Sequence, residues 1–140
     1  MVKPYRRIDT TADVGLAACG LSLIEVYANM AKGLFSLITP LPCIRKRLCR
    51  RVDARASSYE DLLVAWLNEL IFVRETKGLL FRYFEITSLA EDHLESACSG
   101  EVIDLDRHDL RMEIKAATYH RARVWQDSLG LWRARVIFDV

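Results

Sequence analysis

The sequence lacks the features that mark secreted, membrane-spanning or dithiol proteins. No stretch approaches the roughly 18 consecutive apolar residues of a transmembrane helix. The N-terminal segment carries Lys3, Arg6, Arg7, Asp9 and Asp13 without the apolar run of a signal peptide. The four cysteines include no C-x-x-C pair, which disfavours zinc or redox chemistry and predicts buried or half-buried free thiols. We therefore expect an intracellular, cytoplasmic protein without membrane contact.

The sequence also lacks an excess of charge of either sign. Its formal net charge is +1, so no overall field attracts nucleic acid or anionic lipid, and any such affinity must come from a local patch. The most basic stretch, residues 45–51, could bind RNA or an acidic partner. The alternative is a solvated edge strand whose positive charges discourage pairing with other chains. The absence of interleaved aromatic residues, which stack on bases, favours this alternative.

Standard catalytic signatures are missing as well. There is no glycine-rich phosphate loop, no G-x-S-x-G and no H-E-x-x-H. His93, His108 and His120 lie too far apart in the sequence to form a local ligand pair. We interpret them as surface or hydrogen-bonding histidines.

What is present predicts one domain with a substantial core, since the chain has 140 residues and 51% of them are hydrophobic. A helix is predicted over residues 22–39, opened by Ser22 as N-cap with Glu25 in a capping box and ended by the prolines that follow. A second helix is predicted to start after Ser58 and to close at Lys77-Gly78. Both have apolar residues at three- and four-residue steps, so each must bury one face.

The remaining segments alternate between apolar and polar residues, which predicts strands. They lie at residues 48–56, 79–89, 93–103, 110–124 and 132–139, with a bend near residues 116–117. The predicted fold class is therefore α+β, with two amphipathic helices packed on a mostly antiparallel β-sheet in a single domain spanning residues 1–140.

One loop is unusual in its charge. Asp9 and Asp13 lie four positions apart between short predicted strands at residues 5–8 and 16–19. In such a connection Asp and Thr can bond to their own backbone, and Gly15 tolerates unusual dihedral angles. A loop held on both sides can place an oxygen ligand accurately.

A second acidic group lies at the other end of the chain. Asp139 and the α-carboxylate of Val140 end a strand that its apolar residues must order. If Asp13 approaches them, three carboxylates converge in a hard-oxygen site that suits Ca²⁺ or Mg²⁺ better than Zn²⁺. The residues alone leave an alternative open, in which Asp13 caps its own turn and Asp139 pairs with Arg133 or Arg135.

Several motifs resemble those of the archease family. Residues 9–15, Asp-Thr-Thr-Ala-Asp-Val-Gly, resemble its D-H-T-A-D-x-G opening. Further similar segments follow in order at residues 33–38 (GLFSLI), 62–70 (LLVAWLNEL), 78–81 (GLLF), 113–120 (EIKAATYH) and 132–140 (WRARVIFDV). The resemblance runs from Tyr5 to the last residue, with one departure: Thr10 stands where the family has histidine.

The resemblance implies a protein cofactor of an RtcB-type RNA ligase in tRNA splicing and RNA repair. Such a protein is not itself a ligase. It promotes guanylylation of the ligase by GTP and multiple turnover, and meets tRNA halves through the ligase. The resemblance also implies Asp13, Asp139 and Val140 as ligands of a divalent cation, Ca²⁺ before Mg²⁺ or Mn²⁺. Lys115 would act in ligase activation together with the two aspartates, and Asp9 would orient the loop.

Two other functions are alternatives. A chaperone or modulator of another RNA-processing enzyme, such as a tRNA methyltransferase, would use the same face to hold a partner. A metal-dependent hydrolase is disfavoured, because the sequence offers no obvious general base beside the proposed cation.

Overall fold

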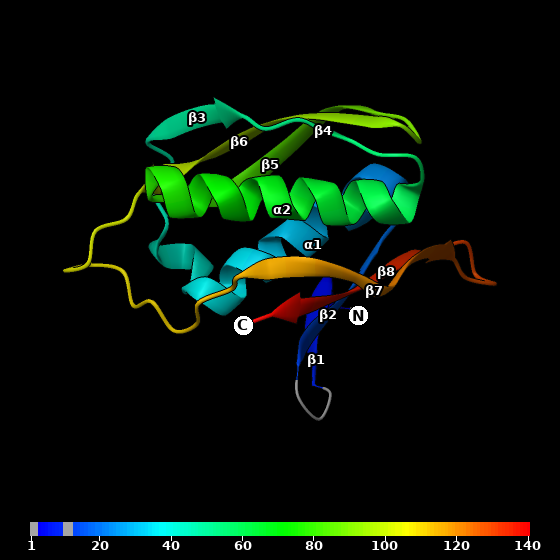
Figure 1. Ribbon diagram of the computed structural model, residues 1–140, viewed down its shortest axis with the longest axis horizontal. Coiled ribbons are helices and arrows are strands. Elements are labelled where there is room, and N and C mark those ends of the chain that lie inside the picture. The colour runs from blue at the N-terminus through cyan, green and yellow to red at the C-terminus, as the bar shows by residue number, and fades with distance from the viewer. Residues whose placement is uncertain (1–2, 10–12) are drawn as a thin grey trace.

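The computed structural model describes residues 3–9 and 13–140, and within them two helices pack between two antiparallel sheets (Figure 1). The elements are, in order, β1 (Tyr5–Asp9), β2 (Val14–Gly20), α1 (Leu23–Ile38), the 3-10 turn η1 (Leu41–Cys43), β3 (Leu48–Arg51), β4 (Ala54–Arg55), α2 (Tyr59–Lys77), β5 (Leu79–Leu89), β6 (His93–Val102), β7 (Ala116–Gln126) and β8 (Trp132–Asp139).

The strands divide between the two sheets. Sheet A has the order β1-β2-β8-β7, so the last strand lies inside the sheet. In sheet B, β6 is central, with β5 on one side and β3 and β4 on successive parts of the other. Every recorded pairing is antiparallel. The predicted α+β class with two helices is confirmed, whereas the division into two sheets was not indicated by the sequence.

Both helices begin and end where the sequence predicts. The hydroxyl oxygens of Ser22 and Ser58 accept hydrogen bonds from the third amide of each helix, both at 3.1 Å. Gly78 ends α2 in the left-handed region (φ 65°), and its amide donates to the carbonyl of Arg74. These caps satisfy backbone groups that a helix end otherwise leaves unpaired.

The helices bury their apolar faces in a shared core. Trp66 of α2 lies 0% exposed, and its indole N–H donates to Ser96 Oγ of β6 at 3.0 Å. Phe35 of α1 contacts Phe81 and Phe84 of β5, each with ring centroids 5.8 Å apart. Such aromatic pairs add to the stabilisation from apolar burial. The core thereby fixes both sheets to the helix layer.

Two predicted strands differ in the structure. The segment predicted at residues 48–56 breaks into β3 and β4, because the Asp53 side chain accepts a hydrogen bond from the Ser96 amide where a backbone carbonyl would continue the ladder. The segment at residues 110–115 is not a strand. Ala116 already pairs with Asp139, the last residue of β8, so the residues before Ala116 have no strand to pair with. The predicted bend at residues 116–117 was also wrong, since the irregularity lies between Thr118 and Arg123.

The connection between β1 and β2 is shorter than predicted. The strands reach Asp9 and start again at Val14, leaving residues 10–13 between them. Gly15 lies inside β2, so it is not required for unusual dihedral angles. It is required because a larger residue would clash with β1: a Cβ at this position would lie 2.8 Å from Ile8 Cγ1. Thr10, which stands where the family has histidine, is outside the described part of the chain.

The cysteines are partly as expected. All four are free thiols, and Cys19 and Cys98 are buried, but Cys43 and Cys49 are exposed, contrary to the prediction. Burial raises the pKa of Cys98 to about 12, so this thiol stays protonated and unreactive. In the described ranges, neither helix combines the length and apolar character needed to cross a membrane.

Candidate metal centre

The register of sheet A brings the two acidic segments to the same end of the molecule. Val14 pairs with Phe138 across β2 and β8. Asp13 directly precedes Val14, and Asp139 directly follows Phe138, so the two aspartates lie on neighbouring strands at the point where this pairing ends. On the other side of β8, Asp139 pairs with Ala116. The segments that carry the predicted ligands therefore meet, while their role as ligands stays a prediction.

The carboxylate of Asp139 lies on the solvent side of the sheet. Phe138 is 0% exposed on the core side, and Asp139 and Val140 are exposed. Asp13 is exposed as well. Exposed carboxylates keep access to water, which must complete the coordination of a cation such as Ca²⁺.

The donors gathered here are oxygen atoms, which fits a hard cation. Among residues 3–9 and 13–140, no group of three or more His, Cys, Asp or Glu side chains is placed to hold a metal ion. The predicted ligand set has only two acidic side chains, those of Asp13 and Asp139, and Val140 stays a predicted third ligand. This set suits Ca²⁺, Mg²⁺ or Mn²⁺ and lacks the nitrogen and sulfur donors that zinc prefers. The backbone of Asp9 pairs with Val14, close to the loop it was predicted to orient.

The alternative pairing proposed for Asp139 is not observed. Arg133 Nε instead contacts Asp127 Oδ2 at 2.8 Å in the β7–β8 turn, and this contact lowers the pKa of Asp127. Over the described residues, no ion pair is recorded between Asp139 and Arg133 or Arg135. The Asp139 carboxylate therefore has no arginine neutralising it in the way that alternative requires.

Lys115 lies beside the acidic end through its backbone. Its amide donates to the carbonyl of Asp139 at 2.8 Å, directly before the first residue of β7. Its side chain is exposed. The proposed activating lysine and the proposed cation ligands thus lie at or next to the ends of β2, β7 and β8, at one end of sheet A.

The start of β7 is fixed by a helix side chain that the sequence reasoning did not single out. Asn68 of α2 accepts a hydrogen bond from the Ala117 amide at 2.8 Å and donates to the Ala117 carbonyl at 3.0 Å. The feature of the sequence that could have indicated this contact is the polar side chain of Asn68 between the buried Leu67 and Leu70. Asn68 thereby positions Lys115, two residues earlier in the chain.

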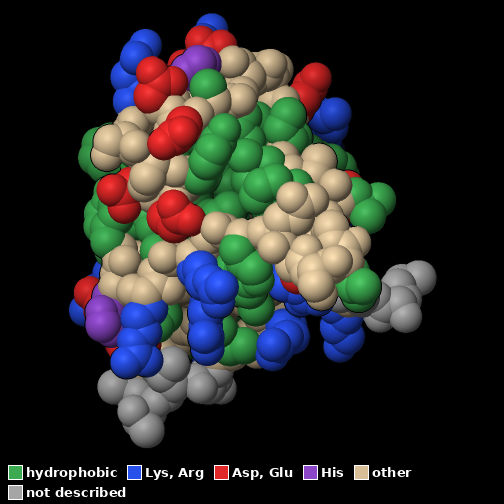
Figure 2. Space-filling view, turned by 90° about the vertical axis from the view of Figure 1, so that its right-hand side faces the viewer, with side chains coloured by type: hydrophobic (Ala, Val, Ile, Leu, Met, Phe, Trp, Pro, Cys, Tyr) green, Lys and Arg blue, Asp and Glu red, His purple; other side chains and the backbone are tan. Residues whose placement is uncertain are grey.

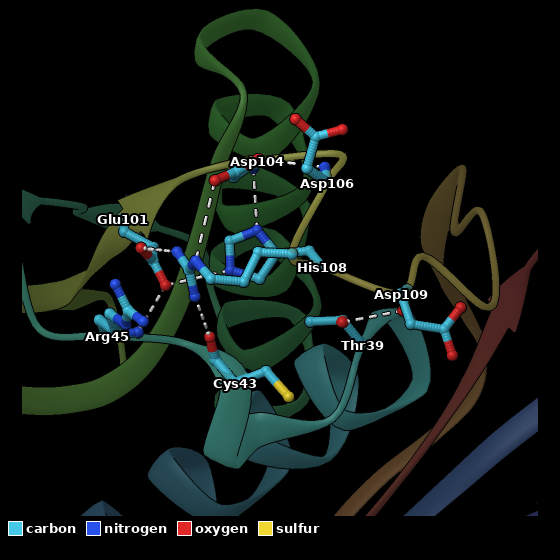
Figure 3. A network of polar contacts seen from close by, with 9 residues as sticks. Thr39, Cys43, Arg45, Glu101, Asp104, Asp106, His108 and Asp109 are labelled. Carbon is cyan, nitrogen blue, oxygen red and sulfur yellow. Dashed lines mark hydrogen bonds and ion pairs between the residues drawn. The ribbon is translucent and has the colours of Figure 1, made fainter.

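A buried polar network holds the segment that leads to Lys115 (Figure 3). Glu101, 6% exposed, accepts hydrogen bonds from the Arg45 amide at 2.6 Å and from the Arg107 guanidinium. His108 Nε2 lies 3.0 Å from Glu101 Oε2, the same oxygen that accepts from the Arg45 amide. Burial alone raises the pKa of Glu101, but the hydrogen bonds from Arg45, Arg107 and His108 outweigh it and lower the pKa to about 2. The Asp104 amide donates to His108 Nδ1 at 2.9 Å. His108 is therefore a hydrogen-bonding histidine, as predicted.

Comparisons with known proteins identify a family for the chain. The sequence model of the Archease protein family matches residues 5–140. The chain is 34% identical to the protein archease of Methanothermobacter thermautotrophicus over 142 aligned positions, covering 99% of this chain and 100% of that protein. It is 30% identical to the protein archease of Pyrococcus abyssi with the same coverage.

Solved structures show the same fold. The solution structure of Methanobacterium thermoautotrophicum protein 1598 superposes with a TM-score of 0.81 at 32% identity, over 99% of this chain and 100% of that one. The crystal structure of an archease from Thermotoga maritima gives a TM-score of 0.63 at 21% identity, over 100% of this chain and 98% of that one, a likeness of fold. By family match, sequence identity and fold, the chain belongs to the archease family.

Proposed function

We propose that this protein is a metal-dependent activator of an RtcB-type RNA ligase, acting in tRNA splicing and RNA repair without being a catalyst itself. It promotes guanylylation of the ligase by GTP and allows repeated turnover. The observation that supports this most is the sheet A register, which gathers Asp13, Asp139, Val140 and Lys115 at one end of a family member.

The cation is held by Asp13, Asp139 and the carboxylate of Val140, with water as the remaining ligands. Ca²⁺ is the first candidate, with Mg²⁺ and Mn²⁺ as alternatives. When bound, the cation supplies positive charge that neutralises the crowded carboxylates and can attract a phosphate oxygen. The pairing of β2 with β8 holds the segments that carry the two aspartates next to each other.

Lys115 supplies a second positive group at the same end. Its backbone is fixed to Asp139, while its exposed side chain is mobile and can reach a nucleotide phosphate or an acidic ligase surface. Two of the three histidines are engaged elsewhere: His108 contacts Glu101, and His93 contacts Asp92 and Ser88, while His120 is exposed on β7. A supporting role for the ligase therefore fits the site better than hydrolysis by the protein itself.

The test supplies limiting RtcB-type ligase with GTP, the divalent cation and cleaved tRNA halves, with and without this protein. We expect multiple turnovers of joined tRNA only with the protein present. Asp13→Ala and Asp139→Ala should abolish the stimulation while circular dichroism reports a folded domain. Equal turnover with and without the wild-type protein would contradict the proposal.

One comparison supports considering a second function. The Thermotoga maritima structure is described as that of a possible chaperone. If this chain holds another RNA-processing enzyme, such as a tRNA methyltransferase, in an active assembly, affinity capture with the tagged protein should recover that enzyme and no RNA ligase. Recovery of the ligase under the same conditions favours the first function.

A further inference from the structure

A row of arginines crosses the outer face of sheet A. The register pairs Arg6 with Ala17, Ala17 with Arg135, and Arg135 with Arg123, so one row runs across all four strands. Directly opposed residues of antiparallel strands point to the same face. The next residue of β8, Val136, is 0% exposed on the core side. The arginine row therefore faces away from the helices.

An aromatic ring lies within this cationic surface. Trp125 pairs with Arg133 in the neighbouring row, and the Arg123 guanidinium lies 4.1 Å from the Trp125 ring centroid. The two rows enclose an open hollow of about 240 Å³. Its polar and aromatic lining consists of Arg6, Arg123, Trp125, Arg133 and Arg135, and its apolar lining of Ile8, Ala17, Ala18 and Ala134.

The charges in this hollow are poorly compensated. Arg133 is paired with Asp127. Over residues 3–9 and 13–140, no ion pair within 4 Å is recorded for Arg6, Arg123 or Arg135. Figure 2 shows Lys and Arg side chains gathered along the lower side of the molecule, the side on which sheet A lies in Figure 1. In a chain of net charge +1 this is a local concentration, and holding like charges together is unfavourable until an anion neutralises them.

We propose that this outer face of sheet A binds single-stranded RNA directly. Arg6, Arg123 and Arg135 contact successive phosphates, and the stacked Arg123–Trp125 pair receives a base. Cationic grooves with aromatic or guanidinium platforms are the usual means of holding single strands. Charge complementarity favours a polyanion over a protein surface, because four arginines line the hollow and, among the described residues, only Arg133 has a recorded carboxylate partner. The choice of RNA over DNA rests on the proposed function.

The same face leads towards the proposed cation. Asp139, Ile137 and Arg135 are alternate residues of β8, so Asp139 and Arg135 are about 13 Å apart along the strand. An RNA strand lying on the arginine row can therefore extend to the acidic end of the sheet. The protein would then contact the RNA itself as well as the ligase.

The basic stretch at residues 45–51 is a weaker candidate. It lies in and before β3 of sheet B, where Arg51 pairs with Asp53 at 2.8 Å and with Glu95 at 3.0 Å. Exposed arginines of sheet B, Arg50 in β3 and Arg55 in β4, thus provide the matched control for charge removed elsewhere on the surface.

The experiment measures fluorescence anisotropy of a labelled oligouridine of about 12 nucleotides, titrated with the full-length protein in the absence of ligase. We expect the logarithm of the association constant to fall with log[salt] with a slope of about −2, as for about three phosphate contacts on a single strand. Arg6→Ala/Arg135→Ala should weaken binding about tenfold or more, whereas Arg50→Ala/Arg55→Ala leaves it within about twofold. Trp125→Ala should weaken it about fivefold or more, and Trp125→Phe should restore most of the loss.

Three results would overturn the inference. They are no binding by the wild type, equal losses in the two arginine pairs, and an affinity for polyglutamate that matches the RNA affinity. Thermal unfolding of each variant confirms that it is folded. Because no ligase is present, RNA binding that persists beside a failed turnover assay refutes the proposed activation and not the RNA site. Turnover without RNA binding does the reverse.

Discussion

The main-chain amide of Lys115 donates a hydrogen bond of 2.8 Å to the carbonyl oxygen of Asp139. Lys115, the proposed phosphate contact, and Asp139, a proposed cation ligand, are therefore joined through their backbones, and neither side chain takes part in the bond. Replacing either side chain leaves this bond in place. The two roles can accordingly be separated by substitution.

Removing one carboxylate should abolish stabilisation by the cation. A divalent ion at a hundredfold excess over its Kd should raise the Tm of the wild type by about 5–10 °C, because it binds only the folded state. Asp139→Asn should remove this shift, and Glu91→Gln, in the exposed β5–β6 turn, should retain it. Differential scanning calorimetry with and without Ca²⁺, Mg²⁺ or Mn²⁺ measures the effect. An unchanged shift in Asp139→Asn would remove this residue from the ligand set.

Lys115→Ala should separate activation from cation binding. The substitution removes a mobile positive group without touching the carboxylates, so the calcium-dependent Tm shift should persist. Ligase turnover should fall about tenfold or more, as expected for the loss of a charge-assisted contact. Lys77→Ala, at the exposed end of α2, is the matched control. Full stimulation by Lys115→Ala would show that the lysine is a solvent-facing residue without a role in activation.

Asn68→Ala should destabilise the fold and misplace the start of β7. It leaves both the amide and the carbonyl of Ala117 without a partner, and Ala117 is only 3% exposed. We expect the free energy of unfolding in urea to fall by about 2–4 kcal/mol. Glu69→Ala, one residue away on the exposed side, should change it by less than about 0.5 kcal/mol. Similar values for the two variants would contradict the anchoring role of Asn68.

Acid should weaken the protein partly through Glu101. Its pKa is about 2 in the folded state, below the ordinary value of 4.5, so the stabilisation is complete above about pH 4.5 and is lost as the pH falls through about 2. Between these values stability should rise with pH, and Glu101→Gln should reduce the slope by up to about 1.4 kcal/mol per pH unit. Urea unfolding at a series of pH values measures the slope, with Glu91→Gln as the control. Identical slopes in the wild type and Glu101→Gln would show that Glu101 does not titrate in this way.

The helices could be predicted from the sequence because their signals are local. Ser22, Ser58 and Gly78 each act within one turn of their own helix, and the structure places each as a cap. The β5–β6 hairpin is equally local and was predicted to within one residue. Residues 110–115 misled the prediction because alternation measures only which side chains are apolar. Whether a strand forms also depends on a neighbouring strand, and none reaches beyond Ala116.

The candidate site depends on distant pairing, which sequence patterns indicate only weakly. Asp13 and Asp139 come together because β8 inserts beside β2 with Val14 opposite Phe138. The arginine row arises in the same way, from residues on four separate strands. Sequence composition reveals charged residues that are neighbours in the chain, such as those at residues 45–51. It does not reveal charged residues that become neighbours only when distant strands pair.

The position of β8 between β2 and β7 has a consequence for synthesis of the protein. While the ribosome is still making residues 132–139, β2 and β7 have no common neighbour, so the middle of sheet A is missing although both helices have already been made. The acidic end and the arginine row are completed only when β8 pairs with β2 and β7. A nascent chain should therefore gain affinity for cation and RNA at the last stage of its folding.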